Sequence, residues 1–330
     1  MQIHSHRQPL PHRALILIPG TVNYFYNQSG RRVGEALESL GFAVEVTTLG
    51  DCLPGEREVC ILSNVSEILH AHGHEEDGLA RIQKIGEGCR VVFSLGIDCV
   101  STQWYQRIRD FSARAGVGTI LDLGLFDQSP FLPIEQRASY GLVFAGLTPS
   151  EERMLDAMGE DDAGRTIPWA FVGSSTPTRV ALVDHLVQRV DPRGFVYMPP
   201  PAPYLEQGSP HLNQEQFERV LARTRYQVWC SGHSYFYMEP ERFRASLLTG
   251  GVPVKILDRG LPVPDSVPLG YLMMEAPEVG GRLTERVFAR IRRRFRADWR
   301  GFPTLADELA RELRRAGIEF EAGRHSTRAA

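Results

Sequence analysis

Two glutamates and an arginine lie close together at the start of the segment 239–254, which reads EPERFRASLLTGGVPV. Glu241 and Arg242 fall in the first turn of a predicted helix, where free backbone N–H groups and the helix dipole favour an anion. A carboxylate can bind ribose hydroxyls, and a guanidinium binds phosphate oxygens. The segment therefore suits a nucleoside diphosphate, although an ordinary solvated helix start with charged residues would explain the same composition.

The segment resembles the nucleotide-sugar segment of the GT-B glycosyltransferases, with the pattern E-[KR]-F-x-x-[AS]-L-x-x-G-x-V-P-V. It is similar to segments in the α-1,3-fucosyltransferases, the exostosin-type transferases and the CgeB-like spore-protein transferases. The resemblance implies that Glu241 holds the donor ribose, that Arg242 faces the donor phosphates, and that Gly250 and Pro253 are structural.

One feature of retaining GT-B enzymes, a pair of glutamates eight positions apart, is missing. Glu239 would pair with Leu247, and the usual second acidic position falls on Ala245 or Ser246. We keep Glu239 and Ser246 as candidate substrate-binding residues, but the departure weakens any link to the retaining sucrose-synthase-like group.

A second segment, 167–179, reads IPWAFVGSSTPTR and predicts a strand, a turn and a capped helix. It resembles the F-x-G-[ST]-x-x-x-x-R segment that opens the carboxyl domain of CgeB-like transferases. The resemblance implies that Gly173, Ser174 and Arg179 approach the donor diphosphate, and a purely structural strand–helix turn is the alternative. The loop before residue 239 adds His233 and Tyr235 as candidates for contact with a phosphate or the sugar.

The first half of the chain alternates buried-type strands with helices, beginning with a strand at 14–18 and a helix at 31–40. Between them we expect a polar and aromatic loop from Gly20 to Gly30, beyond the carboxyl end of the first strand, where open α/β sheets bind ligands. Gly20, Thr21 and Tyr24 are its candidate substrate-binding residues. The absence of the G-x-G-x-x-G fingerprint argues against a dinucleotide coenzyme.

If the reaction inverts the anomeric centre, a general base for the acceptor should come from the first half of the chain. Asp98 is our candidate because it follows a predicted strand at 90–95, and Asp122, Asp127 and Glu75 are the alternatives. The run His70-Ala-His-Gly-His is too weak a pattern to predict a metal site, and we expect an exposed loop there and no metal or other cofactor.

The composition places this chain among ordinary α/β proteins. Its 330 residues suggest two domains. The net charge of −3 argues against a nucleic-acid partner, and the absence of an apolar leader favours a cytoplasmic location. We place an amino-terminal domain at 1–150, a donor domain at 151–275 and carboxyl-terminal helices at 276–330. One of those helices, 282–299, is expected to expose a face formed by Arg286, Arg290, Arg292, Arg293, Arg294 and Arg296, which suits solvent or an anionic membrane surface.

The predicted fold is α/β, with two doubly wound Rossmann-like domains facing a cleft, as in GT-B proteins. The resemblance implies a metal-independent glycosyltransferase of the hexosyl- or deoxyhexosyltransferase type that moves a sugar from a nucleotide-diphosphate donor to a hydroxyl or an amine. A catalytically inactive GT-B protein that acts in binding or assembly is the first alternative, and a sugar-nucleotide epimerase is the second.

Overall fold

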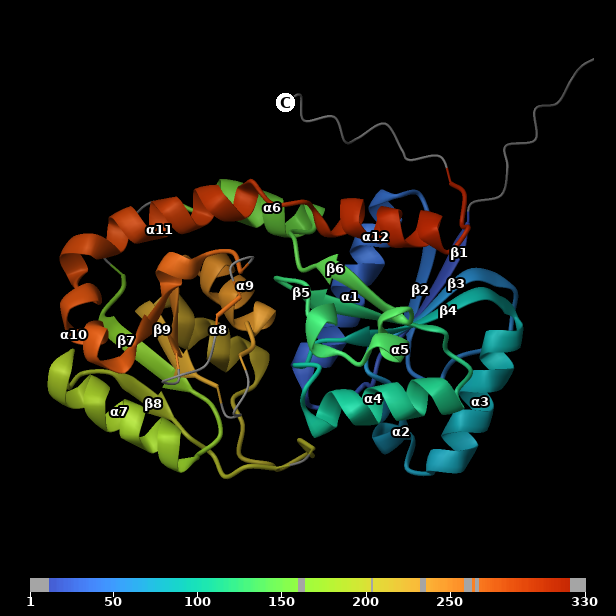
Figure 1. Cartoon of the computed structure of the whole chain (residues 1–330), viewed down its shortest axis with the longest axis horizontal. Helices are drawn as coiled ribbons and strands as arrows, with labels where there is room; N and C mark the ends of the chain where they lie inside the picture. The colour runs from blue at the N-terminus through green and yellow to red at the C-terminus, as the bar shows by residue number, and fades with distance from the viewer. Residues whose placement is uncertain are drawn as a thin grey trace, which may run out of the picture.

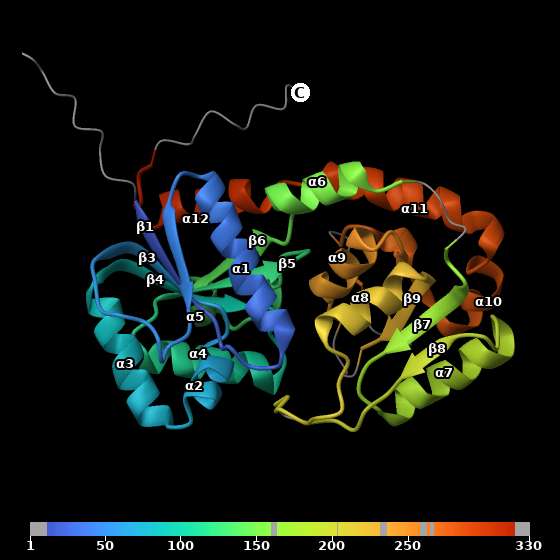
Figure 2. The ribbon, with the colours of Figure 1, turned by 180° about the vertical axis from the view of Figure 1, so that it is seen from behind.

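The computed structural model describes residues 12–159, 164–202, 204–231, 236–257, 263–264 and 267–320. Two lobes lie side by side, each built around a parallel β-sheet with helices on its faces (Figures 1 and 2). Two consecutive carboxyl-terminal helices, α11 (Glu285–Arg300) and α12 (Leu305–Arg315), run along one edge of both lobes.

The first sheet has six strands in the order β2-β1-β3-β4-β5-β6, and every neighbouring pair is parallel. Its elements in chain order are β1 (Arg13–Leu17), α1 (Tyr24–Ser39), β2 (Ala43–Thr47), β3 (Arg57–Leu62), α2 (Val65–His72), α3 (Glu75–Glu87), β4 (Cys89–Gly96), α4 (Gln103–Arg114), β5 (Thr119–Gly124), the short α5 (Ile134–Arg137) and β6 (Tyr140–Phe144).

The second sheet has five parallel strands in the order β11-β10-β9-β7-β8. The chain reaches it through α6 (Pro149–Ala157) and then forms β7 (Ile167–Val172), α7 (Pro177–Arg189), β8 (Phe195–Tyr197), α8 (Gln214–Ala222), β9 (Thr224–Cys230), α9 (Pro240–Leu248), β10 (Val252–Leu257), β11 (Met273–Glu275) and α10 (Val279–Arg282). Among the described residues, no helix is both long enough and apolar enough to cross a membrane.

Side-chain alternation along β1 explains why the first sheet is covered on both faces. Ala14 and Ile16 pack with α1 and α12, whereas Leu15 and Leu17 pack with α2, α3 and α4 on the opposite face. Successive side chains of a strand point to opposite faces, so an unbroken apolar run requires helices on both. The predicted doubly wound α/β architecture is confirmed.

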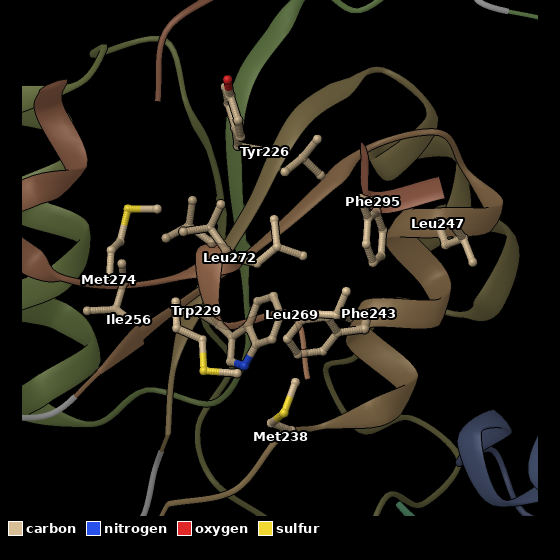
Figure 3. Packing of buried hydrophobic residues seen from close by; sticks show 14 of the residues in the cluster. Tyr226, Trp229, Met238, Phe243, Leu247, Ile256, Leu269, Leu272, Met274 and Phe295 are labelled. Carbon is tan, nitrogen blue, oxygen red and sulfur yellow. The ribbon is translucent and has the colours of Figure 1, made fainter. Parts of the chain in front are cut away.

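The second lobe has one large core that contains side chains from its strands, from α9 and from α11 (Figure 3). Trp229 on β9 packs edge-to-face against Phe243 on α9, with ring centroids 5.3 Å apart. Because Phe243 is fully buried there, the first turn of α9 is held firmly at the carboxyl end of β9.

The carboxyl-terminal helices belong to different cores. Phe295 and Trp299 of α11 pack into the second lobe, while Leu305 and Leu309 of α12 pack against the first lobe beside α1. The chain therefore returns to the first lobe at its end, and the polypeptide crosses between the lobes twice: through α6 and through the α11–α12 junction. The proposed residue boundaries between domains stay a prediction.

Two predictions about helices were wrong. α1 begins at Tyr24, so most of the predicted loop from Gly20 to Gly30 is helical. Gly30 does not end the helix because it faces β1, where an added Cβ would lie 2.6 Å from Ile18. In α11 the expected cationic face is incomplete, since Arg292 is buried beside the ring of Phe288. The buried stripe of α11 runs through Phe288, Arg292, Phe295 and Trp299.

Candidate functional site

The strand order defines where each sheet should bind a ligand. In the first sheet the order reverses between β1 and β3, and in the second sheet it reverses between β7 and β9. Ligands of open α/β sheets bind beyond the carboxyl ends of the strands at such reversal points. In this chain the two reversal points face the boundary between the lobes, because residues that follow β1, β3 and β4 contact the second lobe.

Two arginines converge on the turn after β7. An added Cβ at Gly173 would lie 3.4 Å from Arg242 and 3.6 Å from Arg179. Arg242 donates to the carbonyl of Val172 at 2.8 Å, and Arg179 donates to the hydroxyl of Ser174 at 2.7 Å. The turn therefore carries two positive charges, and its glycine leaves room for another group to approach them.

In the part of the chain that the structure describes, no ion pair neutralises these two charges. Within the described residues, neither Arg179 nor Arg242 lies within ion-pair distance of a carboxylate. Burial lowers the pKa of Arg242, although the nearby Glu239 carboxylate opposes this shift. A half-buried guanidinium pair without a direct counterion, next to the amino terminus of α9, is an arrangement that binds anions such as phosphate.

Glu239 is held beside the arginines by a buried lysine. Lys255 on β10 donates to Glu239 at 2.7 Å and to Ser231 at 2.8 Å, and the indole of Trp229 donates to the same Glu239 oxygen at 2.9 Å. Burial alone would raise the pKa of Glu239, but Lys255 and Arg242 outweigh it and hold this pKa below its usual value. Glu239 is therefore ionised, and the described hydrogen bonds use only one of its two carboxylate oxygens.

Tyr24 brings the first lobe to this site. It opens α1, stacks on Phe25 with ring centroids 4.3 Å apart, and, like Val172 of the second lobe, packs against the small cluster that contains Phe217. Its phenol is buried, which raises its pKa, and Arg242 is the strongest charge acting in the opposite direction. The predicted residues Tyr24, Gly173, Ser174, Arg179, Glu239 and Arg242 thus come together across the two lobes.

Glu241, by contrast, belongs to a buried ion cluster between the lobes. Its carboxylate accepts from Arg32 of α1 at 3.1 Å and from Arg244 at 2.8 Å. Both arginines also donate to Glu151 of α6, at 2.8 and 2.9 Å. Each Glu241 oxygen already accepts a bond within the protein, and its assignment to the donor ribose stays a prediction.

A second group of polar side chains lies beyond the carboxyl ends of β1, β3 and β4. Asn23 donates to Glu67 of α2 at 3.4 Å, and Thr21 lies close enough to the same carboxyl to lower its pKa. Asp98 is near enough to act in the opposite direction, and with burial as the main cause the pKa of Glu67 rises to about 7. Burial also raises the pKa of Asp98 to about 6.

Several polar atoms in this group have no hydrogen-bond partner among the residues that the structure describes. Glu67 Oε2, Asp98 Oδ2, Asn23 Oδ1 and Thr21 Oγ1 are buried and make no hydrogen bond of normal geometry. Buried polar atoms are almost always paired in proteins, so their concentration at one point marks a place for a ligand or for water.

A loop of the second lobe contacts the first lobe beside this group. Tyr204, in the connection between β8 and α8, stacks on His70 of α2 with ring centroids 3.9 Å apart and shares a 3.0 Å hydrogen bond with Ser66. Arg107 of α4 lies 5.8 Å from the same ring. The connection therefore reaches across the boundary between the lobes to the start and end of α2.

The other predicted substrate-binding residues lie away from the two arginines or shape the backbone of a loop. Gly20 adopts a φ of 70° and its N–H donates to Asn27, so it shapes the loop that carries Thr21. Ser246 is buried against Gln227 of β9, and Gly250 ends α9 in the left-handed region, at the opposite end of the helix from Arg242. His233 and Tyr235 lie outside the described residues.

The alternative bases are engaged in local structure. Asp122 accepts from Tyr140 and Gln128, Asp127 accepts from Ser129, and Glu75 pairs with Arg114. Asp98 and Asp122 each keep one buried carboxylate oxygen without a hydrogen-bond partner among the described residues, but the other oxygen of Asp122 accepts from both Tyr140 and Gln128. The predicted exposed loop around His70 was wrong in part, because α2 continues to His72. The described part of the chain contains no group of three or more side chains that could hold a metal ion.

Sequence reasoning missed Glu67, Lys255 and Tyr204. Asn64 followed by Glu67 is a helix-start signal that places a carboxylate in the first turn of α2, beyond the end of β3. A lysine within the apolar strand 252–257 was also a visible anomaly. Tyr204 gave no signal, since its contacts are with residues far away in the sequence.

Comparison with known proteins agrees with this architecture. No protein-family model matches the chain, and no curated protein matches it in sequence. The chain is similar in structure to an α-glucosyltransferase in complex with UDP and a 13-mer DNA containing a HMU base, with a TM-score of 0.64, 9% identity, and coverage of 94% of this chain and 100% of the other.

A second structure of an α-glucosyltransferase, with UDP and a 13-mer DNA containing a central A:G mismatch, gives a TM-score of 0.58 at 9% identity, with the same coverage of both chains. The chain therefore has the two-domain fold of the GT-B glycosyltransferases, as its sequence predicted.

Proposed function

We propose that this protein is a glycosyltransferase that moves a sugar from a nucleotide-diphosphate donor to an acceptor hydroxyl or amine. The observation that carries the proposal is the pair Arg179 and Arg242 at the turn of Gly173, without an ion-pair partner among the described residues. A donor diphosphate supplies the missing negative charge. The GT-B fold and the UDP bound by its structural neighbours support this choice of ligand.

The chemistry that we propose needs no metal. Arg242, Arg179 and the amino terminus of α9 offset the charge that develops on the leaving diphosphate. Glu239, fixed by Lys255, contacts the donor sugar or ribose with its second oxygen. Asp98 takes the proton of the acceptor, in a transfer of the hexosyl or deoxyhexosyl type. The acceptor is not a nucleic acid in this proposal, in keeping with the net charge of −3.

Nucleotide binding tests the donor site. We expect one of UDP, GDP, TDP, CMP and ADP to raise the melting temperature, because a ligand of the native state stabilises it in proportion to ln(1 + [L]/Kd). Arg242→Ala and Arg179→Ala should abolish the shift. Arg189→Ala, an exposed arginine on the same helix as Arg179, should retain it. No shift with any nucleotide, or a full shift in both site variants, would contradict the proposal.

The dependence of transfer on pH tests the role of Asp98. A base must be ionised, and burial raises the pKa of Asp98 to about 6, so kcat/KM should fall as the pH drops through that value. Asp98→Asn should lose transfer at every pH and keep the nucleotide-induced shift. Full transfer by this variant would exclude Asp98 as the base.

Nucleotide binding without hydrolysis or transfer of any donor would favour the inactive binding protein, and release of an epimerised sugar would favour the epimerase.

A further inference from the structure

Three of the four unpartnered atoms in this group share one chemical property that bears on the acceptor, whereas the fourth, Thr21 Oγ1, can both donate and accept. Glu67 Oε2 and Asp98 Oδ2 are carboxyl oxygens, and Asn23 Oδ1 is an amide oxygen whose orientation is set by the bond from Asn23 Nδ2 to Glu67. All three accept hydrogen bonds and cannot donate them when the carboxyls are ionised. A ligand that satisfies them must present several O–H or N–H groups.

The charges around this group also point to the acceptor. The arginines of the donor site are at the turn after β7, and the two arginines within α1, Arg31 and Arg32, face solvent and the ion cluster respectively. Glu67 is 5% exposed, and the described side chains that shift its pKa are Asn23, Asp98 and Thr21, none of which is a cation. An anionic acceptor would bring a like charge into a buried site that already holds two carboxyls.

We propose that Glu67 is an acceptor-binding residue that works beside Asp98, and that the acceptor is a neutral or cationic polyol or amino sugar rather than an acid. The inference rests on the proposed transferase function and names the acceptor class of that site. Glu67 accepts a hydrogen bond from an O–H or N–H group of the acceptor that lies next to the reacting hydroxyl or amine. The acceptor then forms its bond to the anomeric carbon, its proton passes to Asp98, and the bond to the diphosphate breaks with its electron pair leaving on the nucleotide.

Two features argue that Glu67 serves a ligand rather than the fold. A carboxylate that only caps a helix has its oxygens paired with backbone N–H groups, but the cap of α2 is the side chain of Asn64, which accepts from the N–H of Glu67. Among the described residues, Glu67 itself accepts a 3.4 Å bond from Asn23 and leaves one buried oxygen unpaired. Leaving a buried carboxyl oxygen unpaired is costly, and a bound hydroxyl or ammonium group removes that cost.

Binding of three matched hexoses tests the inference without a need for turnover. Glucose, glucosamine and glucuronate differ mainly in charge, and their Kd values can be measured by saturation-transfer NMR with the nucleotide that gives the largest thermal shift present. We expect glucosamine and glucose to bind at least about ten-fold more tightly than glucuronate, since a hydrogen bond to a charged group contributes that much or more. The inference would be overturned if glucuronate bound as tightly as glucosamine, or if none of the three hexoses bound.

Variants separate Glu67 from the remainder of the site. Glu67→Gln keeps the size of the side chain and should weaken glucosamine about ten-fold and reduce the discrimination against glucuronate. Asn23→Ala should weaken both glucose and glucosamine. Glu56→Gln, an exposed glutamate before β3, should change neither Kd. Unchanged glucosamine affinity in Glu67→Gln would exclude the role of Glu67.

The nucleotide-induced thermal shift distinguishes this result from a failure of the donor assignment. If Glu67→Gln retains the shift but hexose selectivity is absent in the native protein, the acceptor inference is wrong and the donor site stands. If no nucleotide shifts the native protein, the proposed function itself fails.

Discussion

Lys255 and Glu239 form a buried pair whose two members depend on each other. Lys255 is 2% exposed, and its ammonium group is bound only by Ser231 and Glu239 among the described residues. We expect Lys255→Met to lower the free energy of unfolding by about 3 kcal/mol, because it leaves Glu239 charged and desolvated without its partner. Urea unfolding without nucleotide measures this change.

A double variant checks the cause of that loss. Glu239→Gln combined with Lys255→Met removes both charges and should be less destabilised than Lys255→Met alone. Lys84→Met on the exposed face of α3 should have little effect. A double variant as unstable as the single one would mean that packing, and not the charge of Glu239, explains the loss.

Residue types alone identified part of the site and could not identify the rest. Arg242, Arg179 and Gly173 were predicted because local patterns at the ends of strands β7 and β9 place them, and the structure brings them together. Glu241 has the same local signal as Arg242, yet its partner Arg32 lies 209 residues earlier in the chain. No rule of sequence spacing predicts an ion pair at that separation, so the sequence could not indicate that the carboxylate of Glu241 is already bound by Arg32.

The periodicity of apolar residues predicted which helices and strands hold the site more accurately than it predicted where those elements begin and end. The helix after Glu239 ends with Gly250 at a φ of 73°, as the double glycine indicated. The start of α1 was missed because Gly30 resembles a loop residue, whereas in the structure it packs closely against Ile18 and Ser63, just beyond the ends of β1 and β3. A helix that packs tightly on a sheet needs small residues on its inner face, and composition alone does not separate that use of glycine from a turn.

The connection that carries Tyr204 should open when its ring is removed. Tyr204→Ala loses the stacking on His70 and the hydrogen bond with Ser66, and an aromatic pair contributes about 1 kcal/mol. We expect the rate of proteolytic cleavage in 199–212 to rise about five-fold, while the melting temperature changes little, because cleavage follows the population of the open form.

Tyr204→Phe provides the matched control for this element. It keeps the ring on His70 and loses only the bond to Ser66, so cleavage should rise less than in Tyr204→Ala. Equal cleavage in the native protein and Tyr204→Ala would show that the contact does not hold the connection against the first lobe.

The arrangement of the two lobes is fixed by the cluster of Arg32, Glu151, Glu241 and Arg244. The four charges sum to zero and come from α1 in the first lobe, α9 in the second, and α6 between them. Every guanidinium nitrogen of the two arginines has a partner, because Arg32 also donates to the carbonyl of Gly146 and Arg244 also donates to Gln28. The site depends on this cluster, since Tyr24 reaches Arg242 only when the lobes are held together.

Removing one charge from the cluster should loosen the whole molecule. Glu151→Gln leaves two buried arginines facing one carboxylate, and we expect the free energy of unfolding at pH 7 to fall by about 3 kcal/mol or more. Glu38→Gln, exposed on α1, should change it little. Burial would raise the pKa of Glu151, but Arg32 and Arg244 outweigh it and hold this pKa below the ordinary value of 4.5.

The sign of the pH effect follows from that lowered pKa. The stability that ionised Glu151 contributes is fully present above pH 4.5 and is lost as the pH falls through its lower pKa in the folded protein. The difference between the native protein and Glu151→Gln in urea unfolding should therefore be constant from pH 7 to about 5 and shrink below pH 4.5. A difference that stays constant down to pH 3 would mean that the charge of Glu151 does not hold the lobes together.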